Sequence, residues 1–174
     1  TAERTTPVTR AAFSADQQLL ALHNDADNSI EIWNTTTRQR SARWQLPKTQ
    51  QNYNALRWSG NDRLALADYD AVVVLNATQG NELLHLTAAP DDTAGHDQID
   101  DVAATPDGQV VAAVTSDGTL RLWNSTDGKL RLTAPTDSRV GHRLTFSPDG
   151  HLLAIGNFQG TLSVWGIRAA KSGA

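Results

Sequence analysis

The stretch that decides the fold runs from Phe146 to Gly166 and reads FSPDGHLLAIGNFQGTLSVWG. A Ser-Pro-Asp-Gly turn at 147–150 leads into an apolar run at 152–155, and a Gln-Gly pair leads into an alternating run at 161–166. Alternation of apolar and polar residues with period two is typical of a strand that buries one face. The stretch therefore predicts two or three short antiparallel strands joined by tight turns.

The same pattern occurs four times along the chain. The Ser or Thr that opens each copy stands at position 14, 59, 105 or 147, which gives spacings of 45, 46 and 42 residues (59−14, 105−59, 147−105). A period of about 40–45 residues is expected for a four-stranded propeller blade. The alternating runs of the four copies are Ser29–Asn34, Ala71–Asn76, Thr119–Asn124 and Thr161–Gly166.

Each of the first three copies also contains a weaker fourth strand, around residues 40–46, 82–87 and 129–133. No segment has helical periodicity over two turns. The sequence thus predicts an all-β chain of four repeats, with approximate boundaries at 8–46, 52–87, 99–134 and 140–168 and a polar tail at 169–174.

Two phrases carry a resemblance to a known family. Phe146–Ala154 and Ser116–Asn124 resemble the signatures that the WD-repeat (WD40) β-propeller family has between its first and second strands and between its second and third strands. The resemblance extends over nearly the whole chain. It implies a β-propeller of four-stranded antiparallel WD40-like blades, about four of them in this chain. The Pro-Asp-Gly turns and the lack of cysteine favour a bacterial source.

The resemblance also implies a hydrogen-bonded network within a blade, made of a His, a hydroxyl, an Asp and a Trp. Copy two has Leu75 where the Trp is expected and Tyr69 in the Asp position, and Gly141-His142 falls inside the first strand of copy four. The residues that match the network are His96, Asp117, Trp123, Trp33, Asp27 and Trp165.

Composition excludes several classes of site and protein. There is no Cys, so disulfides, thiolate zinc sites and a Cys nucleophile are excluded. The longest apolar run, Ala71–Leu75, is far shorter than the roughly 20 residues of a membrane span. A formal charge of −4 argues against binding to nucleic acid, which needs an excess of Lys and Arg.

No motif for catalysis, a metal or a cofactor is found. The five His residues are scattered without metal-ligand spacing, and no nucleophile elbow or phosphate-binding glycine loop occurs. We therefore expect a protein without enzymatic activity, cofactor or metal. Its expected compartment is the cytoplasm, with the periplasm and secretion as open alternatives.

Charge is distributed unevenly along the chain. Residues 64–120 contain ten acids and no Lys or Arg, and the insert Ala88–Gln98 makes the longest connection between two copies. An acidic sector of this kind can steer a partner. Exposed aromatic and acidic residues are then the candidate contacts for a protein partner: Trp44, Tyr53, Tyr69, Asp91, Asp92, Asp97 and Asp100.

The family resemblance implies a non-catalytic protein–protein interaction scaffold, part of a larger or multi-chain propeller. One alternative is a sensor or regulatory domain of a multidomain bacterial NTPase or kinase. Another is a propeller that binds a small ligand or a glycan.

Four repeats leave three architectures open. The chain is part of a longer propeller, or a half-ring that forms a homodimer or pairs with a complementary propeller chain, or a self-closed ring of four blades. The fourth copy ends at its third strand, and Thr1–Pro7 could supply the missing outer strand.

Overall fold

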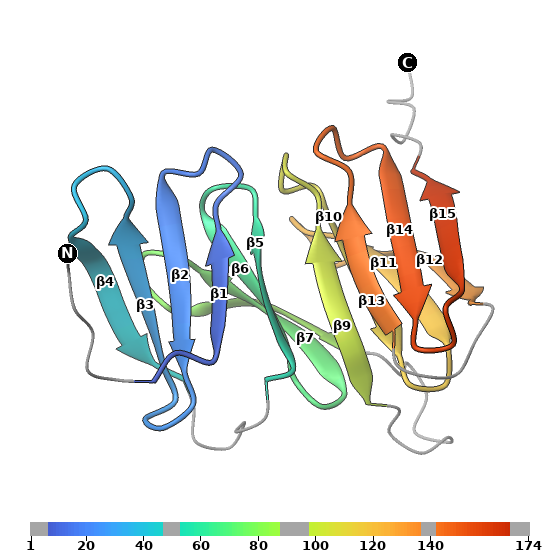
Figure 1. The fold of residues 1–174 in the computed structure, drawn as a ribbon, viewed down its shortest axis with the longest axis horizontal. Coiled ribbons are helices and arrows are strands. Elements are labelled where there is room, and N and C mark those ends of the chain that lie inside the picture. The colour runs from blue at the N-terminus through green and yellow to red at the C-terminus, as the bar shows by residue number, and fades with distance from the viewer. Residues whose placement is uncertain (1–6, 47–52, 88–97, 137–141, 168–174) are drawn as a thin grey trace.

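A computed structural model describes residues 7–46, 53–87, 98–136 and 142–167. Every regular element in these ranges is a β-strand, and the strands form four antiparallel sheets, one for each sequence repeat. We call these sheets blades 1 to 4. Figure 1 shows blade 1 in blue at the left and blade 4 in orange to red at the right, with blades 2 and 3 between and behind them.

Within each blade the strands lie in chain order. Blade 1 contains β1 (Arg10–Phe13), β2 (Leu19–Asn24), β3 (Ser29–Asn34) and β4 (Arg40–Gln45). Blade 2 contains β5 (Ala55–Ser59), β6 (Arg63–Ala67), β7 (Ala71–Asn76) and β8 (Glu82–Thr87). Blade 3 contains β9 (Ile99–Ala104), β10 (Val110–Thr115), β11 (Thr119–Asn124) and β12 (Leu130–Pro135). Blade 4 has three strands, β13 (His142–Phe146), β14 (Leu152–Asn157) and β15 (Leu162–Gly166).

A shared turn explains why Ser or Thr recurs at this position in blades 1, 3 and 4. In blade 4 the Ser147 hydroxyl donates to Asp149 Oδ1 at 2.5 Å, and the same carboxylate accepts the His151 N–H at 3.0 Å. Ser14 with Asp16 and Thr105 with Asp107 repeat this arrangement in blades 1 and 3. The Ser147 hydrogen bond lowers the pKa of Asp149. Each turn thus fixes where the second strand of its blade begins.

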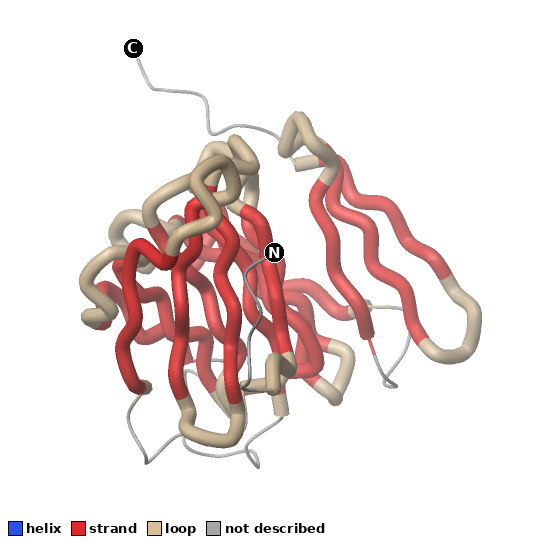
Figure 2. Tube along the Cα trace, turned by 60° about the vertical axis from the view of Figure 1, so that its left-hand side comes forward, coloured by secondary structure: helices blue, strands red, loops and turns tan. Residues whose placement is uncertain are grey.

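The blades form an open arc. The first strands of successive blades contact one another, β1 with β5, β5 with β9 and β9 with β13. Blades 1 and 4 lie at opposite ends of the arc (Figure 1), and a second view shows the three strands of blade 4 standing apart from the others at their outer side (Figure 2). In the described part of the chain, therefore, the arc does not close into a ring.

The hydrophobic core is divided into three layers, each lying between two adjacent blades. The layer between blades 1 and 2 includes Ile30 and Ile32 on one side and Trp58, Leu64 and Leu66 on the other. Equivalent layers lie between blades 2 and 3 and between blades 3 and 4. Because each blade is only one sheet thick, its stability depends on its neighbours.

The predicted all-β class and four-blade organisation are confirmed. The alternating runs at 29–34, 71–76 and 119–124 are β3, β7 and β11, and His142 is indeed the first residue of a strand, β13. Residues 1–6 of the segment proposed to close blade 4 lie outside the described residues, and β15 pairs with β14 alone among the described strands.

One glycine lies where two blades meet closely, and it gives a test of this packing. Gly80 has a φ of +73°, and a Cβ there would overlap the indole ring of Trp44 from blade 1. We expect Gly80→Ala to lower the free energy of unfolding by about 2–4 kcal/mol, since left-handed backbone strain of about 1–2 kcal/mol adds to displacement of the ring. Urea denaturation measures the change.

Gly160→Ala is the matched control for this substitution. Gly160 has a φ of +83° and no atom within 4 Å of an added Cβ. Its substitution should cost only the backbone strain of about 1–2 kcal/mol. If the two variants lost the same free energy of unfolding, this would contradict the prediction that the Trp44 ring adds to the cost of Gly80→Ala.

Candidate functional site: the open faces of the end blades

Every blade has one face toward the preceding blade and one toward the following blade, because side chains alternate along a strand. In blade 4, Leu153 and Ile155 pack against blade 3. The residues between them point the other way, and the strand register places Ala154 beside Val164 and Gly156 beside Leu162. Among the described residues, no blade packs against this second face of blade 4. We call it the C-terminal end face and define it by Leu152, Ala154, Gly156, Leu162 and Val164.

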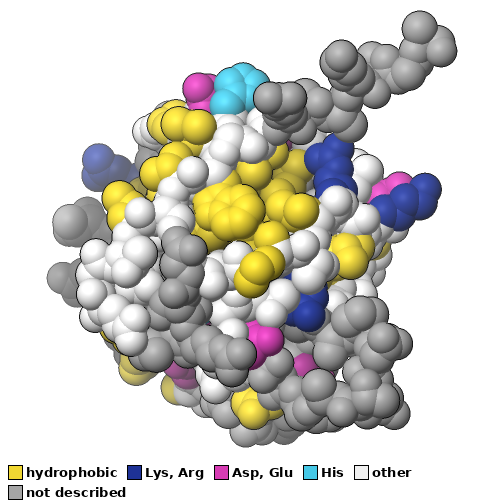
Figure 3. Space-filling model, turned by 90° about the vertical axis from the view of Figure 1, so that its right-hand side faces the viewer, with side chains coloured by type: hydrophobic (Ala, Val, Ile, Leu, Met, Phe, Trp, Pro, Cys, Tyr) yellow, Lys and Arg dark blue, Asp and Glu magenta, His cyan; other side chains and the backbone are white. Residues whose placement is uncertain are grey.

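The C-terminal end face is exposed and mostly apolar, with Arg143 and Thr145 of β13 beside Gly156 and Ala154. Leu162 is 69% exposed and Val164 59% exposed, and Leu152 is also exposed. A Cβ added to Gly156 would meet no atom within 4 Å, so the space above this glycine is open. Figure 3 shows the right-hand side of the molecule, where hydrophobic side chains gather near the centre with Lys and Arg side chains beside them.

The opposite end of the arc presents a second apolar face, on blade 1. The register places Phe13 beside Leu20, and Leu20 beside Trp33, all on the side away from blade 2. Phe13 is 61% exposed. We call this surface the N-terminal end face and define it by Phe13, Leu20, Leu22, Glu31 and Trp33.

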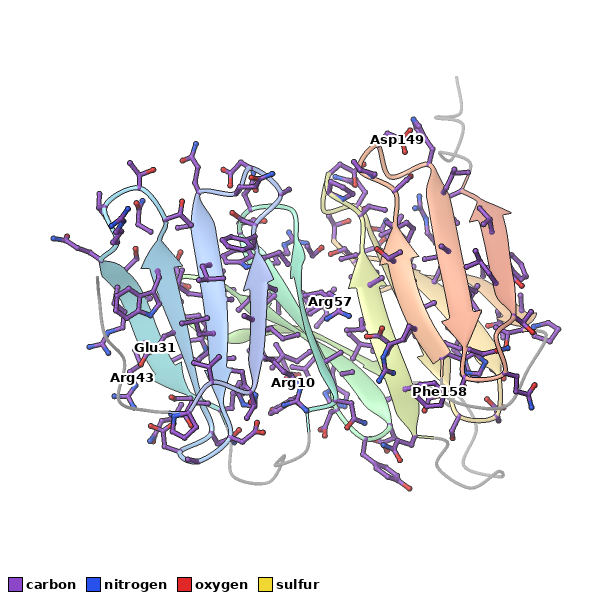
Figure 4. The ribbon with its side chains drawn as sticks, viewed as in Figure 1. Arg10, Glu31, Arg43, Arg57, Asp149 and Phe158 are labelled. Atoms are coloured by element: carbon purple, nitrogen blue, oxygen red, sulfur yellow. The ribbon has the colours of Figure 1, made fainter. Side chains whose placement is uncertain are left out.

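The one carboxylate of the N-terminal end face has partners within blade 1. Glu31 is buried, its Oε2 accepts the Trp33 indole N–H at 2.8 Å, and its Oε1 lies 3.4 Å from Arg40. Beside it, Arg43 pairs with Asp27. Hydrogen bonding from Ser29 lowers the pKa of Asp27, with Arg43 acting in the same direction. Figure 4 labels Glu31 and Arg43 on this side of blade 1.

A buried aspartate holds blade 4, and with it the C-terminal end face, in place. Asp101 in β9 is 2% exposed. Its side chain accepts the Leu144 N–H of β13 at 3.0 Å and lies 3.1 Å from Arg57 of β5. One carboxylate therefore joins blades 2, 3 and 4, and Figure 4 shows Arg57 at the junction.

A second polar group reinforces the junction of blades 3 and 4. His142 is buried at the start of β13. Its backbone N–H and its Nδ1 each lie 3.1 Å from Asp100 Oδ2, and its Nε2 lies 3.1 Å from the Thr136 hydroxyl. The sequence dipeptide Gly141-His142 thus contributes a histidine that links two blades.

The candidate partner contacts proposed from the sequence occupy different environments. Tyr53 is 1% exposed, lies edge-on to His23 with the ring centroids 5.8 Å apart, and has its pKa raised by burial. Trp44 is half-buried over the Gly80 turn, and Asp100 is bonded to His142. Tyr69 is 52% exposed. Asp91, Asp92 and Asp97 lie outside the described residues.

The residues of the network implied by the family resemblance are also spread over several blades. In blade 3, Asp117 receives hydrogen bonds from the hydroxyls of Thr115 and Thr119, at 2.5 and 2.8 Å. These bonds outweigh burial and lower the pKa of Asp117. The hydroxyl partner is thus two residues before the Asp, not at Ala113. Trp123 is buried between blades 2 and 3, Trp165 packs between blades 3 and 4, and His96 lies outside the described residues.

The half-ring considered from the sequence implies two exposed apolar blade faces, but sequence reasoning did not identify the residues that form them. Phe13, Leu162 and Val164 read as ordinary strand residues, and only the exposed face of an end blade distinguishes them. A signal was present for Asp101, because Asp100 and Asp101 are two adjacent acids in the short strand Ile99–Ala104, whose other four residues are apolar.

Other kinds of site are not found in the part of the chain that the structure describes. Its residues include no group of three or more His, Cys, Asp or Glu placed to hold a metal ion. They also include no helix long and apolar enough to cross a membrane.

A comparison with protein families finds the WD domain, G-beta repeat in two stretches, residues 90–124 and 128–166. These stretches contain β9–β11 and β12–β15. The matches support the WD-repeat family through blades 3 and 4. A search of the curated proteins gives no match.

Among solved structures, the chain is similar to the crystal structure of the computationally designed Ika4 protein. The TM-score is 0.67 with 21% sequence identity, over 96% of this chain and 95% of that chain. The likeness supports the propeller-like fold across nearly the entire length of the chain.

Removal of the carboxylate that joins three blades tests its role. In Asp101→Ala the amides of Leu144 and Val102 lose their acceptor. We expect the free energy of unfolding to fall by about 2–4 kcal/mol, because buried donors are left without partners. Amide hydrogen exchange should quicken at Leu144 in particular.

The control for Asp101→Ala is Asp62→Ala, which removes an exposed carboxylate 3.9 Å from Arg63. Its cost should stay below about 0.5 kcal/mol. Equal effects of the two substitutions would refute the role assigned to Asp101.

Burial of His23 makes a pH-dependent contribution to stability. Burial lowers the pKa of His23 below its ordinary value of 6.5, with Asn28 and Asp25 opposing this effect. The unfolded chain therefore binds a proton at a higher pH than the folded chain, and stability should decline as the pH falls from about 7 to about 5. His23→Gln should reduce this slope in chemical denaturation at each pH. His151→Gln, at an exposed turn, should leave it unchanged.

Proposed function

We propose that the chain is a non-catalytic protein–protein interaction scaffold that binds through its two end faces, as part of a larger or multi-chain propeller. The observation that carries the proposal is the exposure of Leu162 and Val164 at 69% and 59%. Monomeric proteins rarely leave a continuous apolar patch uncovered unless it binds something.

Comparison with the inner blades supports this interpretation of the end faces. The strand register gives Leu162 and Val164 the same positions in β15 that other buried residues hold in β3, β7 and β11. Those counterparts, all at most 4% exposed, are Ile30, Ile32, Val72, Val74, Leu120 and Leu122. A partner that covered blade 4 in the same way would gain about 25 cal/mol for each Å² of apolar surface buried.

The edge of blade 4 supports a second mode of contact. Blades 1 to 3 each have a fourth strand paired to the third, whereas the outer edge of β15 has no pairing strand among those described. A free edge offers unpaired backbone N–H and C=O groups to an extended segment of another protein. The partner is thus proposed to cover the C-terminal end face and to pair with β15.

The hydrogen-bond partners of the buried and half-buried aspartates agree with a scaffold function. Asp101 and Asp100 bind across blade boundaries, and Asp117 is occupied by two threonine hydroxyls. These groups hydrogen-bond to residues of the same or a neighbouring blade. Their partners are consistent with a structural role.

A second contact surface is proposed around Tyr69. The Ile99 N–H donates to the Tyr69 carbonyl at 2.8 Å, so this exposed tyrosine lies beside the start of β9, next in sequence to the acidic insert. Tyr69 with Asp91, Asp92 and Asp97 would suit a basic protein surface.

Site-specific photo-crosslinking tests whether the C-terminal end face contacts another protein, and the identity of that protein need not be known in advance. A photoreactive amino acid is placed at Val164 in cells that produce the protein, and at Leu83 as the control. Leu83 is also an exposed apolar residue, but it lies on β8 of an inner blade. We expect a defined protein adduct at Val164 and none at Leu83. The absence of a protein adduct at Val164, or equal labelling at both positions, would contradict the proposal.

A further inference from the structure

We propose that the partner of the end faces is a second copy of this chain, and that two copies close head to tail into a ring of eight blades. This inference rests on the function proposed above and names the partner for that surface. In the ring, the C-terminal end face of each copy packs on the N-terminal end face of the other.

The first argument is that the packing between blades has a direction. At each of the three interfaces, the face toward the following blade has alanine on its second strand: Ala21 in blade 1, Ala65 and Ala67 in blade 2, and Ala112 in blade 3. The face that packs onto it always contributes a large aromatic residue: Trp58, Trp123, or Phe146 with Trp165. The aromatic residues of one blade thus share a layer with alanines of the blade before it, together with larger residues of that earlier blade such as Trp44 and Leu122.

The end faces carry the two unmatched halves of this packing. The C-terminal end face has small residues on its second strand, Ala154 and Gly156, with open space above Gly156. The N-terminal end face has two aromatic residues, Phe13 and Trp33, at the register positions of Trp58 and Leu75 in blade 2. The two end faces therefore complement each other and continue the three interfaces already present.

The N-terminal end face is also suited to burial because its polar groups are already satisfied. The Trp33 indole N–H donates to Glu31, and Glu31 is paired with Arg40. In the inner blades the positions of Phe13 and Trp33 are covered by the preceding blade. Covering them in a second copy would leave no carboxylate of this face without a partner, which avoids the main cost of burying charge.

The four blades that the structure describes are half the number in a ring of eight. Propellers contain about four to eight blades, so chains with four blades each can close as a ring of four or of eight. The end faces of one arc lie at opposite ends and do not cover each other (Figure 1). The described residues of one copy therefore do not close on themselves into a four-bladed ring. A head-to-tail contact that repeats and closes after two copies gives a two-fold symmetric ring.

The experiment measures mass by light scattering over a wide concentration series for the chain and three variants. The chain itself should reach a stable mass of twice 18.8 kDa. Val164→Lys on one end face and Phe13→Asp on the other should each return the mass to 18.8 kDa. The control Leu83→Lys, at an exposed position on an inner blade, should keep the doubled mass.

Mixing the two end-face variants distinguishes loss of contact from loss of fold. An equimolar mixture of Val164→Lys and Phe13→Asp should regain the doubled mass, because one interface is then unaltered and the other brings Lys against Asp. Recovery requires that both variants are folded and that the two faces meet between copies.

Several results would overturn the second copy as partner. These are a mass of 18.8 kDa at every concentration, growth beyond two copies, or no recovery on mixing. If the chain were monomeric while Val164 still crosslinked to a different protein, the scaffold function would stand and this inference alone would fail.

Discussion

The packing of aromatic side chains of one blade against the alanine-bearing face of the blade before it is the interaction on which the rest of the structure depends. A single three- or four-stranded sheet cannot enclose a core, so each blade acquires its buried layer only from its neighbours. Trp58 over the alanine-bearing face of blade 1 and Trp123 over that of blade 2 are two instances of this contact. The open arc, the exposed end faces and the proposed partner all follow from it.

The polar contacts join specific residues of neighbouring blades, while the apolar layers form the core between them. Asp101 accepts a backbone N–H from blade 4 and faces Arg57 of blade 2, and His142 joins blade 4 to Asp100 of blade 3. Apolar packing is not directional, whereas these hydrogen bonds specify one register between neighbouring first strands. The C-terminal end face is therefore presented at a fixed orientation.

Much of the fold could be predicted from the sequence because strand periodicity and turn residues are local signals. The runs 29–34, 71–76 and 119–124 coincide with β3, β7 and β11. The contact surface was harder to predict, because sequence alternation does not reveal which strand faces have a neighbour. Tyr53 and Tyr69 look equivalent in the sequence, yet one is 1% and the other 52% exposed. The end faces likewise cannot be identified from alternation alone, because only the tertiary structure shows which face of a blade is exposed.

The central claim is that the interface between end faces repeats the interface between inner blades, and an experimental structure of the chain at the concentration of its assembly tests it most directly. The account predicts two copies in one ring of eight blades, with Phe13 of each copy buried over Ala154 and Gly156 of the other. A structure in which the two end faces remain in solvent, or in which Phe13 packs against a different surface, would contradict it.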